Sequence, residues 1–345
     1  MMKLSRLMLA AVAVCGTSAV MAQSSVTIYG RVNTTIEHQK TGKESKTGMF
    51  NNNSRIGFKG VEDLGNGLKA GFQLEAGFNS DDGSDALAFK RQSEVNLSGN
   101  FGMVRLGNFY PESYYATSDY IGMHNHETGS SSDVLYYDAA WFDGNLDGNR
   151  TGNKVAYRTP TFNNFWAEAS VSLHEKANNP VVKVNKNAYD LAANYNNGPL
   201  SLGAGYSYWN SNYQAALRGL YTFGQFTVGA YYQRNKDDNA ILGTGAGSRN
   251  NFRLSAMYVL NASEFHVNVG RANKWSNVSD SAATQWTLGY NYNLSKRTKI
   301  YTYYTKVNNG KNASYGYATK DENNNVIRAN GLNTSSFAVG VRHNF

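Results

Sequence analysis

The chain has 345 residues and a formal net charge of +8, and only 17% of its residues are charged. Its 34 glycines and 24 tyrosines, with only 4 prolines, are typical of β-structure with many turns. Outside the N-terminus no run of about 18 apolar residues occurs, which argues against membrane-spanning helices. The basic balance alone would suit a nucleic-acid partner, but no basic helix or RNA-binding motif accompanies it.

The N-terminus has the features of a secretory signal peptide. A basic start and an apolar run precede a small-residue cleavage site that ends at Ala22. We predict that residues 1–22 are cleaved and that residues 23–345 form one exported domain. The single cysteine, Cys15, leaves with the signal peptide, so the mature chain has no disulfide. The alternative is a lipid anchor on Cys15, although Val14 stands where a lipobox has a small residue.

One unit repeats along the mature chain: about ten residues alternate between apolar and polar, and a turn or loop follows. In SVTIYGRVNTTIE, one face carries Val26, Ile28, Val32 and Ile36. The stretches GLKAGFQLEAGF, LSLGAGYSYW and QFTVGAYYQ alternate in the same way. We count 16 such segments, which gives about 20 residues for each strand and its connection.

The connectors between these segments alternate between short and long. Short turns include EDLGNG, SGNFG and TFGQ. The long polar connectors are expected at residues 38–53, 79–88, 175–187, 235–250 and 308–333. Short turns on one side and long loops on the other are typical of an up-and-down barrel in a membrane. The prediction is an all-β chain that forms a 16-stranded antiparallel transmembrane β-barrel.

The distribution of polar residues decides between a membrane barrel and the alternative, a soluble β-sandwich or barrel. Arg, Lys, Glu and Gln occur at strand centres, where a sealed core could not solvate them. Tyr, Phe and Trp occur toward strand ends on the apolar face, as in an interfacial aromatic belt. A barrel of about 16 strands is too wide for side chains to fill, so it encloses an aqueous channel.

Several stretches together resemble a known family. These are SSVTIYGRVNTTIE at 24–37, SRIGFKGVEDLGNGLKAGFQLE at 54–75, NKVAYRTPTFNNFWAEASV at 153–171 and YNLSKRTKIYTYYTK at 292–306. They are similar to the Gram-negative general porins, and most similar to the neisserial and β-proteobacterial branch. The resemblance spans the whole mature chain. It implies a trimeric barrel in the cell outer membrane, with the third extracellular loop folded into the lumen.

The longest connector runs from Asn108 to Asn149, where the resembling porins have their constriction loop. A connector of this length is usually functional or disordered. It is rich in tyrosine, and its candidate acidic residues are Glu112, Asp119, Glu127 and Asp133. The alternative is a solvated surface loop with no role in the channel.

The wall opposite this loop is expected to be basic. Matching positions in the resembling porins carry a row of cations, and the candidates here are Arg31, Arg55, Lys59, Arg91, Arg150 and Arg158. Basic and acidic walls facing each other would create a transverse field at the narrowest point. The alternative for each is an ordinary charge at a strand end.

Two positions depart from the expected pattern. The family often has Gly-Arg at the start of the constriction loop, whereas this chain has Gly107-Asn108, which removes one basic group. The segment RQSEVNLSG does not alternate cleanly. If Arg91 faces the lumen, Glu94 faces outward, and we therefore predict that a neighbouring protomer covers Glu94.

Few motifs indicate chemistry. HNHE at 124–127 places His124, His126 and Glu127 together, but the spacing is not that of a closed zinc site, so we predict no metal and no cofactor. Catalysis in a barrel needs a nucleophile beside a base, and the remaining histidines are scattered singly. We predict that the protein is not an enzyme. A barrel enzyme or adhesin remains the alternative from another class.

The function predicted from these features is passive diffusion of small hydrophilic solutes and ions through a water-filled channel, with a weak anion preference. The alternative within the same fold is a substrate-selective channel that uses the tyrosine-rich loop as a binding strip. The expected partners are two further copies of the chain, outer-membrane lipid and lipopolysaccharide, and the solutes, with no nucleic acid.

The last residues, SSFAVGVRHNF, read as a strand that ends on an aromatic residue. Phe337, Val339 and Val341 share one face, and the strand is expected to pair with the first strand and close the barrel. The resemblance implies that the outer-membrane assembly machinery recognises the terminal Phe345.

Overall fold

The computed structural model describes residues 25–84, 86–124, 129–137, 139, 151–174, 186–238, 245–317 and 329–345. Within these ranges, seventeen strands form a single sheet whose pairings are antiparallel. The strands are β1 (Ser25–Thr41), β2 (Glu44–Asn51), β3 (Arg55–Gly65), β4 (Leu68–Gly77), β5 (Gln92–Gly99), β6 (Gly102–Phe109), β7 (Thr151–Arg158), β8 (Phe165–Ser172), β9 (Ala188–Asn197), β10 (Leu200–Trp209), β11 (Asn212–Phe223), β12 (Phe226–Asp237), β13 (Gly247–Leu260), β14 (Ser263–Ala272), β15 (Ala283–Asn293), β16 (Thr298–Asn309) and β17 (Thr334–Asn344). Helix α2 (Glu112–Thr117) and the 3₁₀ helix η1 (Gly129–Ser131) follow β6. None of the described helices is long or apolar enough to cross a membrane.

Two of the seventeen strands, β2 and β3, share one position in the barrel wall. β1 pairs with β3 through residues 25–31 and with β2 through residues 34–41. Residues 52–54 interrupt the strand between them. The seventeen strands therefore occupy sixteen positions, and the prediction of a 16-stranded antiparallel barrel is confirmed.

The first predicted long connector is shorter than expected. Residues 38–53 were expected to form a loop, but β1 continues to Thr41 and β2 begins at Glu44. The polar side chains do not prevent strand formation, because the backbones of β1 and β2 pair from Thr34 opposite Asn51 to Thr41 opposite Glu44. The barrel wall therefore continues beyond the apolar band on this side.

The outer surface is apolar and the inner surface is polar, the reverse of a soluble protein. On β1, Val26, Ile28 and Ile36 are 65%, 60% and 59% exposed, whereas Asn33 and Thr35 are buried. Because side chains of a strand alternate between its two faces, this pattern runs along the whole strand. Exposed apolar side chains around the barrel form the band that contacts hydrocarbon.

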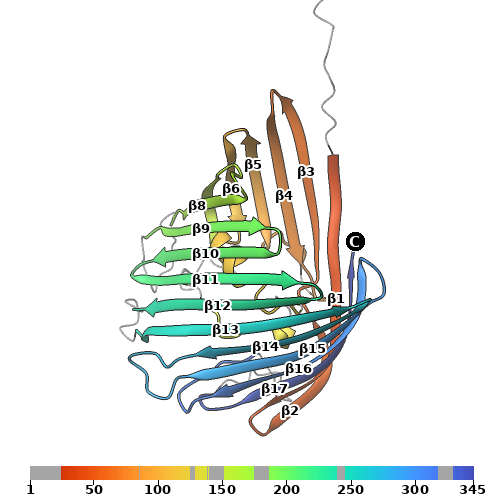
Figure 1. Cartoon of the computed structure of the whole chain (residues 1–345), viewed down its shortest axis with the longest axis vertical. Coiled ribbons are helices and arrows are strands. Elements are labelled where there is room, and N and C mark those ends of the chain that lie inside the picture. Colours follow the sequence, from red (N-terminus) through yellow and green to blue (C-terminus); the bar gives the residue numbers. More distant parts are fainter. Residues whose placement is uncertain are drawn as a thin grey trace, which may run out of the picture.

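The first and last strands close the barrel. They pair in register from Arg31 opposite Asn344 to Thr41 opposite Thr334. Beyond this register, the Gly30 amide donates to the Phe345 carbonyl oxygen at 3.0 Å, and the Phe345 amide donates to the Gly30 carbonyl oxygen at 3.1 Å. Figure 1 shows the C-terminus beside β1. Closure leaves no strand edge facing lipid, as the bilayer requires.

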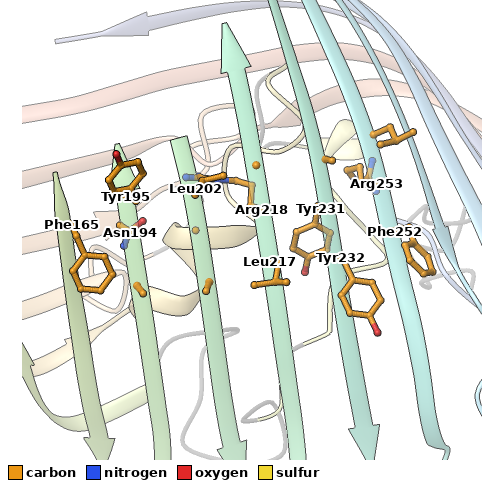
Figure 2. Close-up of a pocket in the computed structure, with 16 residues that line it drawn as sticks. Phe165, Asn194, Tyr195, Leu202, Leu217, Arg218, Tyr231, Tyr232, Phe252 and Arg253 are labelled. Atoms are coloured by element: carbon orange, nitrogen blue, oxygen red, sulfur yellow. The ribbon is translucent and has the colours of Figure 1, made fainter. Parts of the chain in front are cut away.

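A shallow apolar groove crosses the outer surface of β8–β13 (Figure 2). Its lining includes small residues such as Ala204, Gly219 and Ala230 and larger ones such as Leu217 and Tyr232. These residues belong to the outward face of the sheet, which contacts hydrocarbon. The groove is therefore separate from the lumen, which lies on the other side of the same strands.

The constricted lumen as the candidate functional site

The connector between β6 and β7 enters the barrel, where its yellow segment lies inside the ring of strands (Figure 1). Its helix α2 packs against β9, β10 and β11. Two glycines of β10 permit this approach. A Cβ on Gly203 would lie 1.7 Å from the Ala116 carbonyl oxygen, and one on Gly205 would lie 2.7 Å from the Cβ of Ser113. The backbones of the loop and of the wall therefore touch directly.

A buried carboxylate anchors the start of α2. The backbone amide of Ser113 donates to Asp190 Oδ1 at 3.1 Å, and the Ser113 hydroxyl donates to Oδ2. Ser207 on β10 also donates its hydroxyl to Asp190 Oδ2, at 2.6 Å. An acceptor near a helix start satisfies amides that have no partner within the helix. The position of α2 is thus set by specific bonds as well as by the glycines.

The later part of the loop is anchored on other strands. Asp133 forms an ion pair with Arg253 of β13, with 2.5 Å between Oδ1 and Nη2. Ser130 in η1 donates its hydroxyl to Glu37 Oε2 of β1 at 2.8 Å. The loop is therefore bound to the wall at points distributed around the barrel, and its own side chains narrow the lumen.

His124, one of the residues considered for a metal site, lies in an aromatic cluster of the loop and the wall. Its ring centroid is 5.1 Å from that of His266 and 5.4 Å from that of Tyr303. Burial, reinforced by His266, lowers the pKa of His124 well below its usual value, so the ring is neutral. His126 and Glu127 lie outside the described residues. Among the residues that are described, no three His, Cys, Asp or Glu side chains are grouped to hold a metal ion.

Three of the predicted basic residues form a row on the inner face of β1–β5. Arg31 lies opposite Arg55, and Arg55 lies opposite Gly77 on β4. The side chain of Arg91 covers Gly77, since a Cβ there would lie 3.4 Å from Arg91 Cδ. We call Arg31, Arg55 and Arg91 the basic ladder. Strand register alone brings Arg31 and Arg55 together, and Gly77 leaves space for the side chain of Arg91.

An acid that the sequence analysis did not assign to the site, Glu75, lies within the basic ladder. Its Oε1 is 2.7 Å from Arg91 Nε, and its Oε2 is 3.8 Å from Arg55 Nε. Tyr29 donates its hydroxyl to Glu75 Oε2 at 3.1 Å, across the space left by Gly57. With three guanidinium groups and one carboxylate, the ladder keeps a net positive charge.

A buried chain of ions follows the inner wall from β5 to the loop. Arg105 lies between two carboxylates, 2.7 Å from Glu94 Oε2 and 2.9 Å from Glu168 Oε2. Arg158 continues the chain, 2.8 Å from Glu168 Oε2 and 2.7 Å from Glu112 Oε2. We call these five residues the buried ion network. The network connects Glu112, the first residue of α2, to strands β5, β6, β7 and β8.

The prediction that Glu94 faces outward beneath a neighbouring protomer is wrong. Glu94 is 7% exposed and faces the lumen, whereas Val95 and Leu97 point outward and are 54% and 40% exposed. The error arose from extending the alternation of β5 back to Arg91. The strand begins at Gln92, so Arg91 is not bound by the alternation and also reaches the lumen.

The carboxyl group of Glu112 is only partly ionised near neutral pH. Burial raises its pKa to about 7, and the negative charge of Glu168 acts in the same direction. Arg158, at 2.7 Å, lowers the pKa but does not offset the loss of hydration. Glu112 therefore contributes less negative charge to the lumen than a solvated carboxylate would.

The other predicted site residues are distributed as follows. Lys59 is exposed on the inner face of β3, with Nζ 5.4 Å from the centre of the Tyr29 ring. Asp119 is buried in the loop. Arg150 and Glu127 fall outside the described residues. The roles assigned to these residues in the channel stay predictions.

A small polar cavity separates the basic ladder from the loop. We call it the eyelet cavity. Its volume is about 170 Å³, and its lining includes Asn53, Arg91, Tyr110, Tyr114, Asp133 and Tyr136. The first two belong to the wall and the others to the loop. A positively charged wall thus faces a tyrosine-rich loop across this space.

Residues that help to hold the loop in place, notably Arg105, Glu168 and Arg253, were not predicted from the sequence. Each is a charged residue on the polar side of an alternating segment, and that position was the available signal. Alternation gives the face of a strand but not the partner across it. The partners depend on register and on the path of the loop.

A closed barrel with an apolar exterior, a charged interior and an inward loop is a channel-forming protein of the outer membrane. The family model for Gram-negative porins matches residues 9–312, and the chain belongs to this family. The predicted outer-membrane location and channel function are thus confirmed.

Individual relatives agree with this assignment. Outer membrane porin protein 32 of Delftia acidovorans is 32% identical over the full length of both chains. An outer membrane porin protein of Bordetella pertussis is 26% identical over 99% of this chain and 100% of its own. Among solved structures, an anion-selective porin from Comamonas acidovorans has a TM-score of 0.78 and 29% identity, covering 94% of this chain and 100% of its own. The trimer form of OmpT from Vibrio cholerae has a TM-score of 0.62 and 15% identity, covering 93% of this chain and 99% of its own.

Proposed function

We propose that this porin is a general diffusion channel with a weak preference for anions and without catalytic activity. The basic ladder is the observation that carries the proposal. Arg31 and Arg55 lie on the paired strands β1 and β3, Arg91 lies directly before β5, and Glu75 offsets only one of the three charges. The relative from Comamonas acidovorans is described as anion-selective, which supports the same assignment.

The preference should be weak because Glu75 offsets one of the three ladder charges and the others act on a passing ion through water. The carboxylates of the loop oppose the ladder only slightly. Asp133 is paired with Arg253, and Glu112 is paired with Arg158 and partly protonated, so both act weakly on a passing ion. A unit charge about 5 Å from an ion in water contributes roughly 0.5–1 kcal/mol once salt screening is included. Each ladder arginine should thus change local ion concentrations by about two- to fourfold.

Reversal potentials in a planar bilayer test this proposal. Under a KCl gradient, the native channel is expected to give a potential of the sign that indicates chloride preference. The double variant Arg31→Gln/Arg55→Gln should shift it toward cation preference, because two of the three ladder charges are removed. Arg271→Gln serves as the control, since Arg271 is exposed on the outward face of β14. A cation preference of the native channel, or equal shifts in both variants, would contradict the proposal.

A substrate-selective channel is the second candidate, and the tyrosines of the eyelet cavity favour it. Tyr110, Tyr114 and Tyr136 line the same cavity as Arg91. Aromatic faces beside a cation suit solutes that have both a ring and a charge. This candidate differs from simple diffusion in that current should saturate or be blocked by the preferred solute.

The proposal also covers export, assembly and contacts with the membrane. Export would use a signal peptide at residues 1–22, followed by assembly as a homotrimer in contact with outer-membrane lipid and lipopolysaccharide. The trimer form described for OmpT of Vibrio cholerae supports the homotrimer through the shared barrel. The continuous apolar outer band supports contact with lipid on the faces that other protomers leave free.

We predict that deleting Phe345 impairs assembly more than conductance. The deletion removes two backbone hydrogen bonds to Gly30 and a ring that packs on that glycine. Heat-modifiable electrophoretic mobility of membrane fractions should show less folded barrel, whereas single channels that do assemble should conduct normally. Phe337→Ala is the control, because Phe337 is an outward residue of the same strand. Folded barrel at the native level after the deletion would count against a role of Phe345 in assembly.

A further inference from the structure

The eyelet cavity combines a stack of tyrosine rings with a cation. Tyr110 and Tyr114 are stacked, with ring centroids 4.8 Å apart and an angle of 16° between their planes. Tyr136 meets Tyr114 edge-on, with centroids 5.5 Å apart and an angle of 74°. All three rings line the cavity. Such surfaces bind a further flat ring by stacking or by edge-to-face contact.

The charges around the cavity favour an anionic rather than a cationic ligand. Arg91 lines the wall and shares the single carboxylate of Glu75 with Arg55, so these three groups together keep one excess positive charge. Asp133 also lines the cavity, but its Oδ1 is paired with Arg253 and its Oδ2 is buried. The acid is therefore poorly placed to hold an incoming cation. A guanidinium group, in contrast, forms strong charge-assisted hydrogen bonds with a carboxylate.

The size of the cavity limits the ligand. Its volume of about 170 Å³ is similar to that of the engineered cavities of about 150 Å³ that accept benzene. One six-membered ring with one small substituent fits this space. Two serines, Ser118 and Ser132, also belong to the lining.

We propose that the eyelet cavity is a transit site for compact aromatic carboxylates, of which benzoate is the simplest. The carboxylate lies toward Arg91, and the ring lies against Tyr114 and its neighbours. The inference rests on the proposed function, because the ligand reaches the cavity only through a conducting lumen. It adds a class of preferred solute to a channel that otherwise passes small ions.

The native channel provides the first test. Conductance in a planar bilayer is measured with chloride while benzoate, cyclohexanecarboxylate, benzamide or acetate is added. Benzoate is expected to reduce the current in a saturable way at the lowest concentration. Cyclohexanecarboxylate lacks the π system, benzamide lacks the charge and acetate lacks the ring, so each should need a concentration several-fold higher.

Variants locate the site. Tyr114→Leu should weaken the block by benzoate by about three- to tenfold, and Arg91→Gln by about tenfold. Tyr120→Leu is the matched control, since Tyr120 belongs to the same loop, is 52% exposed and does not line the cavity. Heat-modifiable mobility confirms that each variant is folded. If a variant does not fold, the comparison of the four solutes on the native channel still decides the outcome.

The outcomes distinguish a failure of the diffusion channel from a failure of the transit site alone. A native channel without conductance overturns both the diffusion proposal and the transit site. A channel that conducts normally but responds alike to benzoate and acetate overturns the transit site alone. Equal losses in Tyr114→Leu and Tyr120→Leu place the binding elsewhere and also overturn it. Saturable block that Tyr114→Leu and Arg91→Gln weaken, and Tyr120→Leu leaves unchanged, establishes the site.

Discussion

Replacing Arg105 with methionine is expected to destabilise the barrel by about 3 kcal/mol, at the lower end of the cost of breaking a buried ion pair. Arg105 is 7% exposed and holds Glu94 and Glu168, which are 7% and 2% exposed. Without it, Glu94 keeps the amides of Gln92 and Asn96 as its side-chain partners among the described residues. Glu168 retains Arg158 at 2.8 Å, so the expected loss of stability stays at the lower end of that range.

The loss can be measured as a lower urea midpoint for folded barrel in detergent or in vesicles. Arg271→Met is the control for loss of a positive charge, and as an exposed surface change it should stay within about 0.5 kcal/mol of the native protein. Adding Glu94→Gln to Arg105→Met should recover part of the loss, because the unpaired charge is removed. Equal midpoints for the Arg105 and Arg271 variants would show that the buried ion network does not stabilise the barrel.

The architecture was largely predictable because alternation in a membrane barrel is under a strict physical constraint. An outward position must tolerate hydrocarbon and an inward position must tolerate water, so Val26 and Ile28 could be assigned from their spacing alone. The same rule failed where a strand boundary was misplaced. Glu94 was assigned to the wrong face because the alternation was carried one residue too far, to Arg91.

The candidate site was predictable only in part, since it depends on relations between strands. Arg31 and Arg55 could be placed on the polar face from sequence, but their alignment across the sheet follows from register. Glu75 was visible as a polar-face residue, but its contact with Arg91 joins the end of one strand to the start of the next. The path of the loop within a wide lumen is a tertiary property that no local pattern specifies.

The glycines of β10 illustrate a signal that could have been used. LSLGAGYSYW places Gly203 and Gly205 on the polar face, where a strand in contact with water would have no need for glycine. Glycine within a strand often marks the close approach of another backbone. These residues therefore indicated that something packs against the inner wall at this strand, although they did not identify helix α2 as the partner.

Gly203→Ala is expected to displace α2 and lower the conductance. The new Cβ would lie 1.7 Å from the Ala116 carbonyl oxygen, and because this neighbour is backbone, the helix must move away from the wall. Movement away from the wall carries the helix toward the lumen, which narrows the channel further. Overpacking of this kind costs about 1–3 kcal/mol. Single-channel recordings should show a smaller unitary current, and unfolding in urea should show a lower midpoint.

Gly219→Ala provides the matched control, because it changes a strand glycine on neighbouring β11 whose added Cβ would meet only Leu202, at an ordinary 3.6 Å. It should leave both conductance and stability close to native, since Gly219 lines the outer groove and not the lumen. Asp190, which anchors Ser113 of α2, allows a second comparison. Its bonds to Ser113 resist the displacement, so Asp190→Asn combined with Gly203→Ala should narrow the channel more than Gly203→Ala alone. Native unitary current in Gly203→Ala would mean that α2 does not rest on β10, and that the constriction has another support.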